Sequence, residues 1–269
     1  MSFPWIRTAA ATLLVTVTAV GCGRNADSVI ESPPSTTATT SAPAATPAST
    51  ATPTPTPASV AGLSAKAIFA KTKAAAFAAD SVRVRGSFVE SGEKVAIDVH
   101  LTKTGGQGTF TIEGAPIGVI VIGKVVYMQL SEKYLRAQGK ADKLSPADIN
   151  ATVELLKGKW IKLSKPSKPD DGFDDLIKLT TRDSFFGEIF QPGGGLTKTR
   201  QKTVDGVRAI GLSDGEGTLW VDTLTARPVR VETRSDGVDE ALRFSDYNQL
   251  KAPKAPPASL TMDGRKLGL

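Results

Sequence analysis

The chain has 269 residues, a formal net charge of +6, 40% hydrophobic residues and a single cysteine. One cysteine excludes an intramolecular disulfide, so a folded domain must be held together by its apolar core, and a chain of this length can bury one. Lysines and arginines are dispersed among acidic residues, without a basic stripe interleaved with aromatic residues. Nucleic acid is therefore not expected as a partner.

The N-terminus has the pattern of an export signal. Arg7 and the amino terminus are positive, and residues 8–20 are apolar or small throughout. About 13 residues suit the hydrophobic region of a signal peptide and fall short of the roughly 20 that span a bilayer. We therefore expect residues 1–21 to be a signal peptide and not a transmembrane helix.

Cys22 ends this segment. The run Thr18-Ala19-Val20-Gly21-Cys22 resembles the bacterial lipobox, in which signal peptidase cuts before a cysteine diacylated on sulfur; it departs from that motif at Ala19, where Leu is most common. The resemblance implies that Cys22, carrying acyl groups such as palmitate, anchors the protein to the extracytoplasmic face of the cell membrane. The alternative is ordinary secretion with Cys22 as an unpaired thiol.

A low-complexity segment follows the cysteine. Residues 32–59 contain only Ser, Pro, Thr and Ala. Such a segment cannot bury enough apolar surface to offset the entropy of ordering, so residues 22–62 are expected to be a disordered linker. This linker would reach on the order of 40 Å as a coil and ~120 Å when stretched. Its composition permits O-glycosylation as well as a role as a plain spacer.

The folded part, expected as a single domain over residues 63–269, begins with a helix. Ser64 is suited to cap it, and the apolar residues Ile68, Phe69, Ala76 and Phe77 lie near helical spacing. After residue 80 the apolar period changes to two, which indicates strands joined by Gly-containing turns, an antiparallel meander. The expected strands of this first run are 82–88, 94–101, 108–112, 117–122 and 125–130.

The second half has helices and then more strands. Ser145 and Pro146 indicate a helix that runs to residue 156 and is closed by Gly158, and two short helical pieces are expected between residues 173 and 190. Asp-Gly pairs mark hairpin corners among the later strands. The expected strands are 159–163, 196–204, 207–212, 217–221, 229–233 and 241–244, followed by a proline-broken tail that packs loosely. The sequence thus predicts an α+β fold, with about 10–11 strands in a curved antiparallel sheet and helices on its concave face.

In this order of elements the chain resembles the actinobacterial lipoproteins of the LppX/LprG type, which share the half-barrel of the LolA/LolB carriers. The resemblance extends from about residue 63 to residue 248. It is carried by the order of several segments, no one of them specific: 81–86 (SVRVRG), 123–128 (GKVVYM), 158–163 (GKWIKL), 217–222 (GTLWVD) and 228–231 (PVRV).

The resemblance implies a hydrophobic cavity between sheet and helices that binds the acyl chains of lipids or lipidated molecules, in a monomeric carrier or sensor. The alternative is an envelope-tethered protein-interaction module without a bound lipid, in which the same residues are simply core. The candidate cavity residues are Val99, Phe110, Ile112, Val119, Val121, Tyr127, Trp160, Phe185, Phe186 and Phe190.

The residues that catalysis requires are scarce, and we expect no enzyme, no cofactor and no metal site. The alternation places His100, the one histidine, on the polar face of its strand. Ser91 to Lys94 and Lys103 to Gly105 match S-x-x-K and K-T-G of penicillin-binding enzymes, but the first falls in a hairpin and the second follows too closely, so both are read as chance. The acidic pairs at 170–171 and 174–175 suit a helix N-terminus better than a metal ion.

Overall fold

The computed structural model describes residues 59–90, 93–163, 173–191, 195–235 and 238–267. The expected signal peptide, Cys22 and the linker as far as residue 58 lie outside these residues. The same is true of Ser91, Gly92 and the acidic pair at 170–171.

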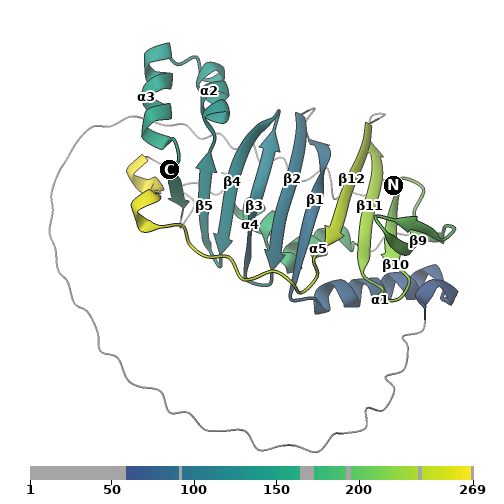
Figure 1. Ribbon diagram of the computed structural model, residues 1–269. Helices are drawn as coiled ribbons and strands as arrows, with labels where there is room; N and C mark the ends of the chain where they lie inside the picture. The colour runs from purple at the N-terminus through teal and green to yellow at the C-terminus, as the bar shows by residue number, and fades with distance from the viewer. Residues whose placement is uncertain (1–58, 91–92, 164–172, 192–194, 236–237, 268–269) are drawn as a thin grey trace, which may run out of the picture.

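One curved, unclosed sheet dominates the described residues (Figure 1). Within them it contains thirteen strands in the order β13-β6-β5-β4-β3-β2-β1-β12-β11-β10-β9-β7, with β8 paired to β9. Neighbours are antiparallel except β13 and β6. The first strands are β1 Ser81–Glu90, β2 Glu93–Thr102, β3 Gly105–Ile112, β4 Ala115–Ile122, β5 Val125–Leu130 and β6 Trp160–Leu163. The others are β7 Thr197–Lys198, β8 Lys202–Val204, β9 Val207–Ser213, β10 Gly217–Asp222, β11 Pro228–Ser235, β12 Val238–Ser245 and β13 Thr261–Asp263.

Helices complete the predicted α+β fold: α1 Ala65–Ala78, α2 Glu132–Ala141, α3 Pro146–Leu156, α4 Phe173–Thr180 and α5 Arg182–Ile189. Contacts join α4 to β2, β3 and β4, α5 to β2, and α1 to α5, so these three helices cover one side of the sheet (Figure 1). The helices α2 and α3 instead form a pair beyond the end of β5, where α2 contacts β4.

Two predicted helix starts and one predicted hairpin corner are confirmed, whereas Gly92 and the corner at 236–237 lie outside the described residues. The Ser64 hydroxyl accepts a hydrogen bond from the Ala67 N–H, and the Ser145 hydroxyl accepts one from the Asp148 N–H. At the β8–β9 corner Asp205 and Gly206 have φ of 49° and 82°, the left-handed pair of a type I′ hairpin turn. The corner fixes Val204 opposite Val207.

Two parts of the chain differ from expectation. Helix α2 is not among the elements predicted from the sequence, although Ser131 caps it by accepting a hydrogen bond from the Tyr134 N–H. The buried residues of α2 are Tyr134, Leu135 and Gly139. The C-terminal tail does not pack loosely: its prolines precede β13, which pairs with β6, and Leu267 beyond it is buried. β13 and the division of segment 196–204 into β7 and β8 raise the strand number from the expected eleven to the thirteen of the described residues.

The seam between β1 and β12 joins the two strand runs into one sheet. Their pairing extends from Arg83↔Ser245 to Ser87↔Ala241. At Gly86 the strands approach so closely that an added Cβ would lie 1.9 Å from the carbonyl oxygen of Ala241. Only glycine fits there without moving a backbone.

We therefore expect Gly86→Ala to lower the free energy of unfolding by about 2–3 kcal/mol, because the added methyl forces the seam apart. Gly187→Ala is the matched control, since an added Cβ in α5 meets nothing within 4 Å. It should be neutral or stabilising by about 0.5–1 kcal/mol. Urea unfolding followed by tryptophan fluorescence measures both; equal effects would contradict a tight seam.

Candidate functional site

The sheet has one apolar face, here named the inner face, on which α5 packs. A buried row crosses it in register from Phe244 through Val84 and Val99 to Val119. Phe244 contacts the rings of Phe185 and Phe186 on α5, which identifies this face as the one that the helices cover. The opposite, outer face carries the alternate residues, such as Arg83 and Asp98.

Eight of the ten candidate cavity residues belong to the inner face or to α5. On the strands these are Val99, Phe110, Ile112, Val119 and Val121, and on α5 and its C-terminal cap they are Phe185, Phe186 and Phe190. All are buried except Ile112, which is half-buried.

The structure does not bring Tyr127 and Trp160 to the inner face. On β5 the residues Val126, Met128 and Leu130 are the buried ones, so the pleat turns Tyr127 outward, opposite Ile120. The ring of Trp160 lies 3.3 Å from the position of a Cβ on Gly118, also on the outer face. Choosing these residues for their aromatic rings overlooked the alternation of their strands.

The α5 phenylalanines pack in an aromatic cluster with α1 and β12. Phe186 contacts Phe77, Phe185, Phe190 and Phe244, with centroid distances of 5.8 to 6.2 Å. Phe69 meets Phe190 edge to face at 5.6 Å. Because Phe186 is 0% exposed, protein fills the interior at this point.

The inner face stays apolar up to its opposite end, where its residues are less covered. Phe88, Val95 and Ile112 form a cross-strand row on β1, β2 and β3, and each is half-buried. The α4–α5 junction lies at the other end of β2, where Thr181 bridges to Thr102. We name Phe88, Val95 and Ile112 the open row.

Arg182 is an unexpected member of the interior. It shares the buried stripe of α5 with Phe185, Phe186 and Ile189 and is 2% exposed. Its Nε donates to Asp183 Oδ1 at 2.7 Å and Nη2 donates to the same oxygen, but Nη1 has no acceptor among the described residues. Leaving a buried donor unpaired costs about 1–3 kcal/mol. The sequence signal was the i, i+3, i+4 spacing from Arg182 to the phenylalanines.

A second buried charged residue, Glu240, has a hydrogen-bond donor within the fold for each of its carboxylate oxygens. Its side chain accepts hydrogen bonds from the Val89 N–H at 2.8 Å and from the Thr233 hydroxyl at 3.0 Å. The Glu240 carboxylate binds the backbone of β1 just beyond Ser87↔Ala241, the last residue pair between β1 and β12. This carboxylate is therefore a structural group.

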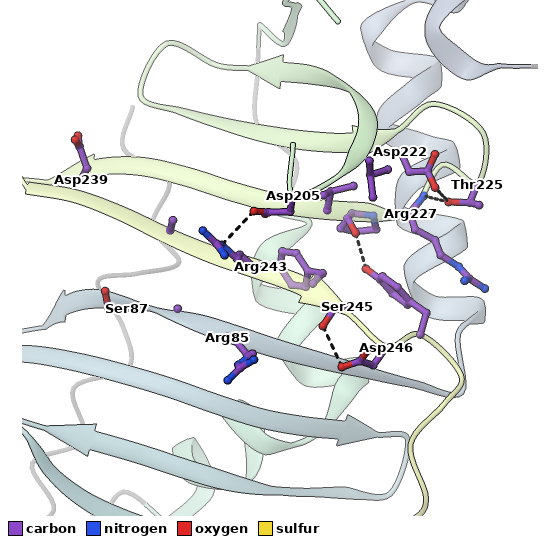
Figure 2. Close-up of a pocket in the computed structure, with 17 residues that line it drawn as sticks. Arg85, Ser87, Asp205, Asp222, Thr225, Arg227, Asp239, Arg243, Ser245 and Asp246 are labelled. Atoms are coloured by element: carbon purple, nitrogen blue, oxygen red, sulfur yellow. Dashed lines mark hydrogen bonds and ion pairs between the residues drawn. The ribbon is translucent and has the colours of Figure 1, made fainter. Parts of the chain in front are cut away.

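A pocket of about 770 Å³ lies along β1, β12 and the β8–β9 corner, on the outer face (Figure 2). Its charged groups have partners: Arg243 lies 3.4 Å from Asp205, and Arg85 lies 3.1 Å from Asp98. The Tyr247 hydroxyl donates to the Pro228 carbonyl, and burial raises its pKa well above the usual value. The pocket thus offers no unpaired buried group to a ligand.

Catalytic and metal-binding groups do not gather in the part of the chain that the structure describes. No three His, Cys, Asp or Glu residues there could hold a metal ion together. His100 is half-buried on the outer face, opposite Arg83. Lys103 and Thr104 form the exposed β2–β3 corner, and Ser91 and the side chains at 174–175 lie outside the described residues.

No family model and no curated protein matches the chain. Among solved structures, LprF from Mycobacterium bovis is similar at 14% identity and a TM-score of 0.48, covering 71% of this chain and 96% of its own. The Mycobacterium tuberculosis lipoprotein LppX is similar at 14% identity and a TM-score of 0.40, covering 70% and 99%. These two are lipoproteins of the LppX/LprG type. The MucA/MucB complex of Pseudomonas aeruginosa is similar at 14% identity and a TM-score of 0.33, covering 72% and 59%. At such identities no residue role carries over.

Phe186→Ala is expected to lower the free energy of unfolding by about 3–5 kcal/mol, because it empties the centre of the aromatic cluster. Phe88→Ala in the open row removes the same atoms from a half-buried site and should cost about 1–2 kcal/mol. Chemical denaturation compares the two. A smaller cost for Phe186→Ala than for Phe88→Ala would mean that α5 is loosely seated.

Proposed function

We propose that this domain binds the acyl chain of a lipid or lipidated molecule on its inner face, and that it does so from a membrane anchor at Cys22. The observation that carries the proposal is the open row, where an otherwise covered apolar face is left half-buried. The protein then acts by binding, as a carrier or sensor, with no bond made or broken.

An alkyl chain suits the open row better than a peptide does. β1, β2 and β3 are interior strands whose backbone groups are paired on both sides, so a peptide cannot add a strand there. An acyl chain requires no hydrogen bonds and contributes about 0.8 kcal/mol for each methylene that it buries. The open row therefore favours a ligand that is mostly hydrocarbon.

The anchor brings the domain to a source of acyl chains. No helix among the described residues combines the length and the apolar composition needed to cross a membrane. Acylation of Cys22 would hold the chain at the extracytoplasmic face of the cell membrane, and linker 22–62 would let the domain work at the bilayer or away from it. The end strands of the sheet, β13 and β7, have three and two residues, which supports a monomer because little edge backbone is free for a second copy.

The alternative is a tethered protein-interaction module. It is favoured by Leu144 and Leu155 on the α2–α3 pair, which are 39% and 48% exposed. Measuring the lipid that copurifies with the chain separates the two functions, because an interaction module retains no lipid.

Ile112→Glu is expected to reduce the lipid that copurifies with the full anchored chain by about tenfold or more, because a carboxylate in the open row must be desolvated beside an alkyl chain. Ile120→Glu is the matched control: Ile120 is also half-buried and lies on the neighbouring strand, but on the outer face. Lipid extraction followed by mass spectrometry measures retention.

Retention in Ile120→Glu should equal that of the unmodified chain. Equal retention in both variants would remove the open row from the binding surface. Finding no lipid on the unmodified chain would favour the interaction module.

Cys22→Ala is expected to abolish incorporation of labelled palmitate and to move the protein from the membrane fraction to the medium or buffer. Gly23→Ala, next to the anchor, should leave both unchanged. If Cys22→Ala stays in the membrane fraction without label, something other than this cysteine holds the protein there.

A further inference from the structure

The guanidinium of Arg182 is a cation kept inside the domain. The side chain is 2% exposed and belongs to the stripe of α5 that faces the sheet. Arginine keeps its charge in proteins, so burial does not neutralise it. Two of its nitrogens share one carboxylate oxygen of Asp183, which leaves Nη1 buried and without an acceptor in the described part of the chain.

Asp183 compensates this charge only in part. Its side chain is 54% exposed, so water screens the carboxylate while the guanidinium is dry. The start of α5 adds positive potential, because the helix begins at Arg182 and the Thr181 side chain makes no capping hydrogen bond to it. The buried Nη1, which has no acceptor among the described residues, and a helix N-terminus thus favour a second negative group at the same place.

We propose that Arg182 binds the anionic oxygen of the lipid that the inner face holds, a carboxylate or a phosphate. This inference rests on the proposed function and adds the chemistry of the ligand: an anionic amphiphile. Guanidinium forms its strongest hydrogen bonds with these two groups. The exposure of Asp183 places the head-group end close to solvent.

The position of Arg182 sets the direction of the ligand. The α4–α5 junction meets β2 at Thr102, and the open row crosses β2 at Val95. About seven residues of strand separate these points, roughly 23 Å. The head group would lie at the α4–α5 junction. Because Leu101, Val99 and Ile97 between the two points are buried, the alkyl chain would have to separate α5 from the inner face to reach the open row.

Binding of lipid pairs that differ only in the anion tests this assignment. The full anchored chain in dodecyl maltoside is titrated with oleate and methyl oleate, and with dioleoyl phosphatidic acid and dioleoylglycerol, and native mass spectrometry counts the bound lipid. We expect at least one anionic lipid to bind about ten- to a hundredfold more tightly than its neutral counterpart. Preference for oleate identifies a carboxylate, and preference for phosphatidic acid identifies a phosphate.

Arg182→Met should remove this preference and keep binding of the neutral lipids, since methionine fills the site with apolar atoms. Arg85→Met is the matched control: it removes the same charge from a 56% exposed residue of the outer face and should keep the preference. Arg182→Lys should keep part of the preference for the anionic lipid. Chemical denaturation verifies that each variant is folded.

The outcomes distinguish the two proposals. Equal binding of anionic and neutral lipids by the unmodified chain overturns the role of Arg182 and leaves lipid binding in place, whatever the variants do. If the folded Arg182→Met variant still prefers the anionic lipid, the role of Arg182 is also overturned. Binding of no probe by the unmodified chain overturns the proposed function together with this inference.

Discussion

The alternation of apolar and polar residues along β1 to β5 forces one face of an open sheet to be covered. A closed barrel covers such a face with its own strands, but the described sheet ends at β13 and β7 without closing. Helices α1, α4 and α5 provide the cover instead. Their cover is complete around Phe186, which is 0% exposed, and incomplete at Ile112. The proposed lipid binding rests on this difference along one face.

Arg182 breaks the apolar pattern of α5 at its first residue. A hydrophobic residue of similar volume at a buried charged position is often neutral or stabilising, so we expect the fold to tolerate one in place of this guanidinium. Departures from local consistency of this kind gather at functional sites. Glu240 is the contrast, because both of its oxygens accept hydrogen bonds that hold β1, β11 and β12 together.

The outer face is stabilised differently, by paired charges. Arg85, Arg243 and Arg230 lie opposite one another on β1, β12 and β11, an arrangement of like charges that is unfavourable by itself. Acidic groups offset it: Asp205 contacts both Arg230 and Arg243. A hydrogen bond from Arg83 holds the pKa of Asp98 below its usual value. Arg85 and Arg243, which line the outer pocket and face each other across the seam, are thus each paired with an acidic group.

The sequence by itself determined the elements whose signals are local. Period-two alternation indicated β1 to β5, serine caps indicated the starts of α1 and α3, and Asp205-Gly206 indicated a hairpin corner, because each depends on neighbouring residues only. Tertiary structure alone decided which face of the sheet the helices cover. Once that face is known, the alternation along β5 places Tyr127 on the opposite one. Tertiary structure also decided that β13 pairs with β6 and that Arg182 is buried. Both depend on segments far apart in the chain. No local pattern records the pairing of β13, and the spacing from Arg182 to Phe185 and Phe186 indicates a shared helix face but not what covers it.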